Sequence, residues 1–355
     1  MVNSLFLNCK KSVFLHAEMN TIPHIFKFTC RLIFSILCLY VMVVISGCNQ
    51  KQTDSNTTNQ VSAQQKKEPV LWEAPDITML GNSDSEQLIK YGEKLIENTA
   101  FYLGPKGTTA HLSNGMNCQN CHLNAGTKPF GNNYAAVAAN YPKFRERSGS
   151  VESIYKRVND CIERSLNGHG LDTASREMQA IQAYIKWLGK DVAKGTKPNG
   201  SGLTELAYLD QAADTEKGKV VYIAKCTVCH GANGEGKFNP DNITYQYPPL
   251  WGGHSYTMAA GLFRLSRLAG YVKSNMPFGA DHVNPQLTDE EAWNVAAFVN
   301  SQPRPTRDIS KDWPKKASKP IDHPFGPYTD TFSQHQHKYG PFAAIAAFKK
   351  QQQHK

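Results

Sequence analysis

Residues 118–122 read CQNCH and residues 226–230 read CTVCH, so the pattern C-x-x-C-H occurs twice in this chain of 355 residues. Two cysteines one helical turn apart can bond to both vinyl groups of one porphyrin, and the histidine that follows can bind its iron. A lone C-x-x-C would also suit half of a zinc site or a redox dithiol, but the ligands and the βαβ context that those need are not visible here. The pattern therefore predicts two covalently bound haem c groups. Their protein ligands would be Cys118, Cys121 and His122, and Cys226, Cys229 and His230.

Each pentapeptide lies inside a similar helical frame. A helix that contains a glycine is expected before each motif, around Gly92 and around Gly218. After each motif, residues 175–189 and 289–301 have apolar residues at helical spacing, and Thr288 with the acids that follow it is a helix cap. The two closing segments align at four pairs: Glu177 with Glu291, Ala183 with Ala297, Tyr184 with Phe298, and Ile185 with Val299. This internal duplication predicts an all-α fold of two tandem cytochrome c-like domains.

The duplication also sets the expected domain boundaries. The segment KDVAKGTKPNGSG, residues 190–202, is rich in Lys, Gly, Pro and Ser and is typical of a linker. We expect an N-terminal cytochrome c domain with the active-site haem over residues 76–195, a linker over 196–212, a second domain with an electron-transfer haem over 213–305, and an extended C-terminal tail over 306–355. The sequence does not decide whether that tail packs against the domains.

The N-terminal region carries the signs of export. Residues 32–47 are 16 residues without a formal charge, which is typical of the apolar core of a signal peptide. Ser46 and Gly47 before Cys48 resemble a lipoprotein cleavage box, in which the cysteine carries the lipid; an uncleaved signal anchor is the alternative. We expect a signal peptide over residues 1–47, with Met19 as an alternative start, a polar tether over residues 48–75, and a periplasmic lipoprotein anchored at Cys48.

Charge and compartment narrow the chemistry. Residues 1–47 hold four Lys or Arg and one Glu, so the formal charge of +9 becomes +6 without them. A moderately basic exported protein favours anionic substrates or acidic partners, and a nucleic-acid partner is not expected in this compartment. Exported cysteines normally pair as disulfides or carry a cofactor, which leaves Cys161 without an evident purpose.

The duplication suggests the second axial ligand of each iron. Met276 stands 15 residues before Glu291, and a methionine ligand suits an electron-transfer haem, although Met258 competes with it. The corresponding position in the first copy is Cys161, 16 residues before Glu177. A cysteine thiolate would lower the potential of that haem. The alternatives are that Cys161 is a buried inert thiol, forms a disulfide with a partner, or stands by while His169 binds the iron.

The surroundings of Cys161 suit anion chemistry. Residues 151–166 lack Gly and Pro and are expected to form a helix, so Arg157, Arg164 and Ser165 would share or border the face of Cys161. Cationic and hydroxyl groups stabilise a thiolate and can hold a small oxyanion. Exposed arginines are common on helices, so this cluster alone is weak evidence.

Several stretches resemble the dihaem thiosulfate dehydrogenases, which couple two thiosulfates to tetrathionate and pass two electrons to a cytochrome. The resemblance covers about residues 70–345. Its stretches are CxxCHLNAGTKPF from residue 118, YPKFRERSGS from 141, RVNDCIERSLNG from 157, SREMQAIQAYIKWLG from 175, PPLWGGHSY from 248, NMPFG from 275, and the tail sequences DWPKKASKPIDHPFGPYTDTF and HKYGPF.

The resemblance implies roles for particular residues. Cys161 would be the axial ligand of the active-site haem, and would leave the iron to bond with the outer sulfur of the first thiosulfate. Ser165 and Arg147 would contact substrate, with Arg145 as a close alternative to Arg147. Met276 would bind the exit haem. Some members place a lysine on that iron, but no lysine occurs between Lys237 and Lys273, so this exchange is not expected here.

The expected activity is thus oxidation of thiosulfate to tetrathionate, with a small redox protein such as a c-type cytochrome as electron acceptor. Reverse reduction of tetrathionate uses the same chemistry, and the sequence does not fix the direction. The alternatives are a non-catalytic dihaem electron-transfer cytochrome and a subunit of a sulfur-oxidising complex. A dihaem peroxidase is disfavoured because it needs an open iron, and both copies offer a sixth ligand.

Overall fold

The computed structural model describes residues 70–353. The predicted signal peptide, Cys48 and most of the predicted tether lie outside the described residues. Within residues 70–353, no helix combines the length and apolar character that crossing a bilayer requires. The described part of the chain consists of helices and long loops with two short hairpins, so the all-α prediction is confirmed.

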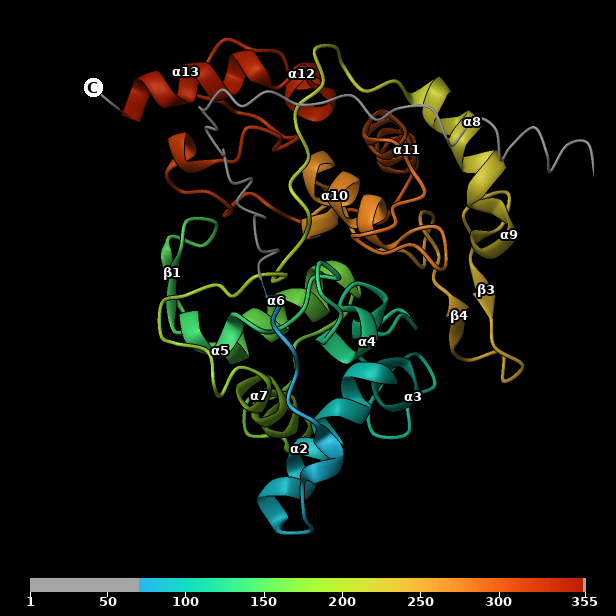
Figure 1. Cartoon of the computed structure of the whole chain (residues 1–355), viewed down its shortest axis with the longest axis vertical. Helices are drawn as coiled ribbons and strands as arrows, with labels where there is room; N and C mark the ends of the chain where they lie inside the picture. The colour runs from blue at the N-terminus through green and yellow to red at the C-terminus, as the bar shows by residue number, and fades with distance from the viewer. Residues whose placement is uncertain (1–69, 354–355) are drawn as a thin grey trace, which may run out of the picture. The chain divides into compact units, whose positions relative to one another are not determined.

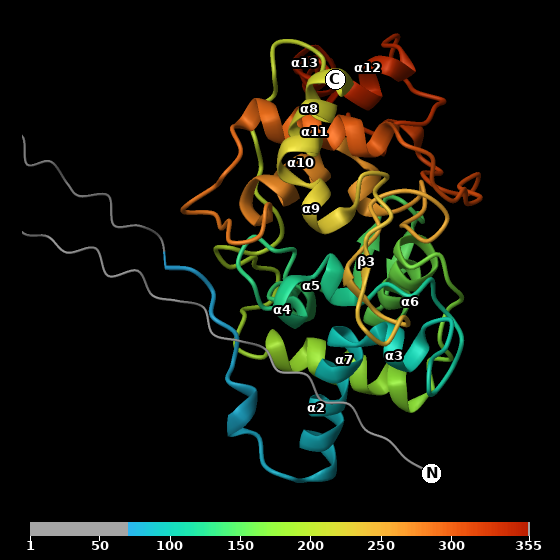
Figure 2. The same cartoon turned by 90° about the vertical axis from the view of Figure 1, so that its right-hand side faces the viewer.

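We call residues 76–195 the first module, residues 213–305 the second module and residues 306–353 the tail. In Figure 1 the helices of the first module lie below those of the second module, and Figure 2 shows the same division from another side. The first module contains η1 (Ile77–Met79), α2 (Asp84–Glu97), α3 (Thr99–Leu103), η2 (Cys118–Asn120), α4 (Leu123–Gly126), α5 (Val137–Asn140), β1 (Lys143–Arg145), β2 (Ser150–Glu152), α6 (Ile154–Ser165) and α7 (Arg176–Leu188).

The second module repeats the plan in fewer elements, and the tail adds three helices. The second module contains α8 (Thr215–Lys225), α9 (Thr227–His230), β3 (Lys237–Phe238), β4 (Tyr245–Tyr247), η3 (Gly261–Phe263), α10 (Leu265–Asn275) and α11 (Asp289–Ser301). The tail contains η4 (Lys316–Ser318), α12 (Gln334–Tyr339) and α13 (Ala343–Gln353). Each hairpin, β1–β2 and β3–β4, is antiparallel.

Each module is closed by a pair of helices that cross at a glycine. A Cβ atom on Gly92 of α2 would lie 2.1 Å from the carbonyl oxygen of Ala180 and 2.7 Å from the Cβ of Tyr184 in α7. A Cβ atom on Gly218 of α8 would lie 1.9 Å from the Asn294 carbonyl oxygen and 2.9 Å from the Cβ of Phe298 in α11. Tyr184 and Phe298 are the pair that the sequence aligns, so both modules use the same crossing.

Local signals place the helix starts. The hydroxyl of Thr288 accepts a hydrogen bond from the Glu291 amide (3.1 Å), and the Glu291 carboxylate accepts one from the Thr288 amide (2.8 Å). This reciprocal cap begins α11 where the sequence predicts it. The helix expected around Gly92 is divided at Asn98, whose φ of −122° is not helical. The break lets the Ala100 amide donate to the Asn117 side chain (2.8 Å), which draws α3 to the loop before the first haem motif.

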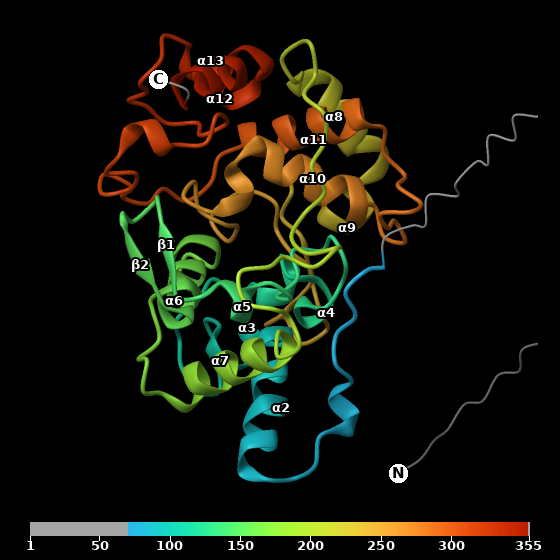
Figure 3. The same cartoon turned by 60° about the vertical axis from the view of Figure 1, so that its left-hand side comes forward.

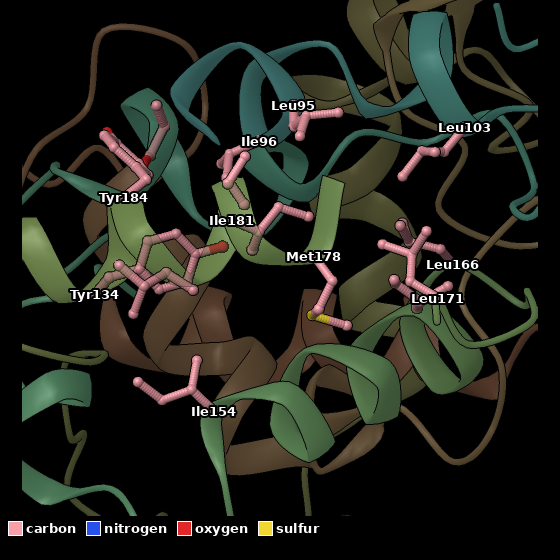
Figure 4. Close-up of a cluster of buried hydrophobic side chains, with 14 of the residues drawn as sticks. Leu95, Ile96, Leu103, Tyr134, Ile154, Leu166, Leu171, Met178, Ile181 and Tyr184 are labelled. Atoms are coloured by element: carbon pink, nitrogen blue, oxygen red, sulfur yellow. The ribbon is translucent and has the colours of Figure 1, made fainter. Parts of the chain in front are cut away.

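The core of the first module lies between α2 and α7. Figure 4 shows Ile96 of α2 next to Ile181 of α7, with Tyr184 one turn further along α7. The Tyr184 hydroxyl donates to the Ala125 carbonyl oxygen (3.1 Å), just after the first haem motif. The helix pair thereby fixes the position of the segment that carries the haem ligands.

The predicted linker is packed rather than free. The amides of Phe130 and Asn132 donate to the carbonyls of Gly200 (2.7 Å) and Gly202 (2.8 Å), and Leu203 is buried in the core of the second module. The end of the predicted tether is packed as well, since the Trp72 amide donates to the Asn199 carbonyl (3.0 Å) and the indole packs against the first core. Apolar burial of Trp72 and Leu203 explains why these segments are ordered despite their polar composition.

The tail is a packed strap that contacts both modules. Asp312 forms a two-pronged ion pair with Arg164 of α6, both oxygens lying 2.7 Å from guanidinium nitrogens. The Trp313 amide donates to the Arg147 carbonyl (2.7 Å) in the turn of the β1–β2 hairpin, beside which the tail runs in Figure 3. Ile345 further along the tail is buried in the core of the second module.

We expect Asp312→Asn to destabilise the protein by about 3 kcal/mol, because removing one partner of a buried ion pair leaves the other charge uncompensated. Both side chains of the Arg164–Asp312 pair are largely shielded from solvent. The measurement is the urea midpoint of the haem-loaded protein. Asp308→Asn is the matched control, since Asp308 is exposed on the same strap and caps the Ser310 amide (2.8 Å). Equal midpoints for the two variants would contradict the role of the strap.

Candidate functional site

The first module contains a cavity of about 460 Å³. Cys118, Cys121 and His122 line it, and so does Cys161. A volume of several hundred Å³ with a mainly apolar wall is typical of a cofactor pocket. The fold thus places the first predicted haem-attachment motif and Cys161 around the same cavity.

The two motif histidines are held in the orientation that metal binding requires. Nδ1 of His122 lies 2.6 Å from the Asn132 carbonyl oxygen, and Nδ1 of His230 lies 2.9 Å from the Pro248 carbonyl oxygen. When Nδ1 donates its proton to a carbonyl, Nε2 keeps its lone pair for a metal. Burial lowers the pKa of His122 to about 4 and also lowers the pKa of His230, which favours the neutral ligand form.

Three of the four motif thiols lie in apolar surroundings that suit covalent attachment. Burial raises the pKa of Cys118 to about 11, that of Cys121 to about 12 and that of Cys226 to about 11. All five cysteines of residues 70–353 are free of disulfides. A thioether bond to a porphyrin removes the ionisable proton, so apolar surroundings that disfavour a thiolate are compatible with it. Both motifs therefore fit a haem c group.

Helix α6 presents three polar side chains to the cavity. Arg157, Cys161 and Ser165 lie on its wall at successive i, i+4 positions. The negative charge that the Cys161 sulfur can carry raises the pKa of the Arg157 guanidinium above its usual range, so the two groups lie close together. Ser153 begins the helix by accepting a hydrogen bond from the Lys156 amide (3.2 Å), which fixes this register.

Two other residues named from the sequence are not on this wall. Arg164 turns away from the cavity to pair with Asp312. His169 is exposed, and its amide donates to the Leu112 carbonyl (2.9 Å) beyond the end of α6. The placement favours Cys161 over His169 as the axial ligand of the first haem.

The two arginines of the β1–β2 hairpin, Arg145 and Arg147, have different surroundings. Arg145 lies on the cavity wall, with its Nε 3.9 Å from a Glu152 carboxylate oxygen. Arg147 does not line the cavity; its guanidinium lies over the Trp313 ring, 5.9 Å from the centroid. Burial, with Arg164 nearby, lowers the pKa of Arg147 to about 10. The substrate role of Arg147 stays a prediction, and Arg145 is better placed for it.

The second module offers a methionine to its haem. Met276 follows the last residue of α10 and packs, together with Cys226, against the core of the second module. Met258 instead packs with Tyr256, Ala260 and Phe263 in a separate cluster. This arrangement favours Met276 over Met258 as the axial ligand.

Part of the wall of the first cavity comes from the second module. Gly261, Leu262 and Arg267 all line it. Two hydrogen bonds hold α10 to the first module. The Tyr271 hydroxyl donates to the Asn120 carbonyl (2.7 Å), inside the first haem motif, and the side-chain amide of Asn275 donates to the Phe130 carbonyl (3.0 Å). No local pattern in the sequence predicts this contact, because it depends on how the two modules pack.

Comparison with known proteins agrees with this architecture. Residues 108–193 match the family model described as the SoxA/TsdA cytochrome c domain, and residues 215–303 match the cytochrome c model. A solved structure, the thiosulfate dehydrogenase (TsdBA) of Marichromatium purpuratum in its as-isolated form, superposes with a TM-score of 0.61 at 30% identity, covering 66% of this chain. The match spans half of that longer protein.

Relatives that match over most of their length give the family. The thiosulfate dehydrogenase of Psychrobacter arcticus is 34% identical over 241 residues, which cover 68% of this chain and 71% of the relative. The thiosulfate dehydrogenase of Allochromatium vinosum is 34% identical over 235 residues, which cover 65% of this chain and 83% of the relative. The prediction of two covalently bound haem c groups is confirmed by the two cytochrome c domains. The chain belongs to the family of dihaem c-type thiosulfate dehydrogenases.

Proposed function

We propose that this protein oxidises two thiosulfates to one tetrathionate and passes the two electrons to an external acceptor. Family membership supports the oxidation of thiosulfate by a cytochrome. The observation that supports this mechanism best is the meeting of Cys161, Arg157 and Ser165 on the wall of the cavity that also holds Cys118, Cys121 and His122. A nucleophilic sulfur, a cation and a hydroxyl face one space that an anion can enter.

Each haem would have a distinct ligand set. Cys118, Cys121, His122 and Cys161 would hold the first haem. The second haem would be held by Cys226, Cys229, His230 and Met276. When bound, the two haems together can take up two electrons and release them singly, and thiolate ligation of the first would set its potential below that of the second.

Electrostatics explains why the cavity needs this set of side chains. Two thiosulfate dianions repel each other, so their sulfurs bond only if positive charge holds them and they react one at a time. Arg157 supplies a fixed positive charge one helical turn before Cys161, and Ser165 supplies a hydroxyl donor one turn after it. Either group can hydrogen-bond to the sulfonate oxygens of a substrate whose outer sulfur faces Cys161.

The reaction divides into two balanced steps at Cys161. In the first step, the cysteine thiolate and the outer sulfur of one thiosulfate form a sulfur–sulfur bond. The two sulfur atoms together lose two electrons, which pass to the external acceptor. In the second, the outer sulfur of another thiosulfate attacks the sulfur bound to cysteine, which forms tetrathionate and expels the cysteine thiolate. No proton is consumed or released, and Cys161 is regenerated.

Several further assignments are part of this proposal. The acceptor would be a small redox protein such as a c-type cytochrome, and the protein would be exported to the periplasm and anchored through a lipid on Cys48. Tetrathionate reduction would follow the same two steps in reverse. The predicted signal peptide and the small residues before Cys48 support this location.

The proposal is tested by steady-state assay of the purified, haem-loaded protein with thiosulfate and ferricyanide. We expect turnover without any other protein, with one tetrathionate formed and two ferricyanides reduced for every two thiosulfates consumed. No turnover by the isolated protein would instead indicate an electron relay or a subunit of a larger complex.

A further inference from the structure

The wall of the first cavity carries a cation that belongs to the second module. Arg267 lies in the first half of α10, and its neighbours on the wall from the same module are Gly261 and Leu262. The hydrogen bond from Tyr271 to Asn120, one turn further along α10, holds this helix against the first haem motif. The position of Arg267 is therefore fixed by the contact between the modules.

Two arginines of α6 and two at the start of α10 fall into two kinds, Arg264 being the residue just before α10. Arg164 and Arg264 are each bound by an aspartate of the tail: Asp312 holds the first, and Asp322 accepts a hydrogen bond from Nε of the second (2.7 Å). Arg157 and Arg267 line the cavity instead. Among residues 70–353, neither of these two guanidinium groups forms an ion pair with a carboxylate. The tail thus pairs with Arg164 and Arg264 and leaves Arg157 and Arg267 on the cavity wall.

The charge on the cavity wall is unbalanced. Its cations are Lys143, Arg145, Arg157, Lys197 and Arg267, and its one carboxylate among the described residues is Glu205. Burial, together with Arg264, lowers the pKa of Arg267, and Arg157 acts in the same direction. Glu205 lies near enough to oppose this effect but forms no ion pair with Arg267. A desolvated guanidinium beside another one is costly unless an anion in the cavity offsets it.

We propose that Arg267 is an anion-binding residue of the first cavity, supplied by the second module and acting beside Arg157. The ligand is an oxyanion of one of two sources: a propionate of the first haem, or the sulfonate of a thiosulfate. The second source deepens the proposed function and rests on it. In either case the second module completes the first site.

The two sources predict different results. A cation beside a propionate favours the reduced haem, so its loss would lower the reduction potential of that haem. A cation that binds substrate would instead act on the apparent affinity for thiosulfate. A hydrogen bond to a charged group contributes about 1.5–3 kcal/mol, so removing it should raise KM by roughly 10-fold or more.

The experiment compares Arg267→Gln and Arg267→Lys with the wild type, all haem-loaded. The first-haem potential is followed by spectroelectrochemical titration, and KM and kcat are measured for thiosulfate with ferricyanide. Arg176→Gln is the matched control, because it removes one positive charge from an exposed position in the first module that does not line the cavity. Intact mass and thermal midpoint verify that each variant carries both haems and is folded.

Each outcome decides the proposal. A lower potential in Arg267→Gln with partial recovery in Arg267→Lys identifies a propionate. A raised KM with an unchanged potential identifies thiosulfate. Potential and KM both equal to those of Arg176→Gln overturn the proposal. If the wild type does not oxidise thiosulfate, the proposed function fails by itself, and the potential alone then decides whether Arg267 binds an anion.

Discussion

Cys161→Ser is expected to reduce thiosulfate turnover by roughly 10³-fold or more, while both haems stay covalently attached. Attachment uses Cys118, Cys121, Cys226 and Cys229, so it does not depend on Cys161. A serine hydroxyl cannot form the sulfur–sulfur bond of the first step, and it is a poor leaving group in the second. The measurement is kcat with ferricyanide, together with the intact mass of the protein.

Glu163→Gln provides a matched control on the same helix. Glu163 is two residues from Cys161 but does not line the cavity; its carboxylate pairs with Arg307 of the tail (2.9 Å). This variant should keep kcat within about 2-fold, since a partly exposed ion pair contributes little. Turnover by Cys161→Ser at the level of Glu163→Gln would remove the nucleophile from the mechanism.

Gly218→Ala is expected to destabilise the second module by about 3 kcal/mol or more. The added Cβ would meet the Asn294 carbonyl oxygen at 1.9 Å, which is backbone and cannot move aside without separating α8 from α11. Because α8 leads directly into the second haem motif, part of the effect should appear as weaker retention of the axial ligand that Met276 is proposed to supply. The unfolding midpoint and the visible spectrum of the second haem are the measurements.

Gly253→Ala is the control for this substitution. A Cβ atom on Gly253 would have no neighbour within 4 Å, so only the local backbone changes. The expected effect is within about 1 kcal/mol, and an alanine that restricts the unfolded chain can even stabilise. If Gly218→Ala unfolds at the same denaturant concentration as Gly253→Ala, the glycine crossing is not what closes the module.

The sequence predicts well whatever depends on local pattern or on the duplication. The pairing of Tyr184 with Phe298 follows from aligning the two closing segments, and the structure places both side chains against the crossing glycines. The same alignment points to Cys161, which lies on the cavity wall. The pairing of Tyr184 with Phe298 is predictable because a repeated fold repeats its internal distances, whereas the role of Cys161 as an iron ligand stays a prediction.

The sequence does not predict what depends on packing between distant segments. Arg145 ends β1 and Arg147 lies in the turn that follows it. The packing of Trp313 of the tail against the Arg147 guanidinium shows which of the two arginines lies at the cavity. Arg267 is an ordinary helical arginine in the sequence, and it becomes part of the first site through contacts of α10 with the first module, such as that of Tyr271 with Asn120. Ordering of the tail likewise depends on partners far away in the chain, such as Arg164.

The central claim is that the sulfur of Cys161 faces the first haem as its axial ligand. Electron paramagnetic resonance of the oxidised wild type tests it most directly, with Cys161→Ser alongside. We expect two low-spin haem signals, one with the g values of thiolate ligation, and we expect that one alone to change in the variant. A wild-type spectrum without a thiolate signal, or one that Cys161→Ser leaves unchanged, would contradict the claim.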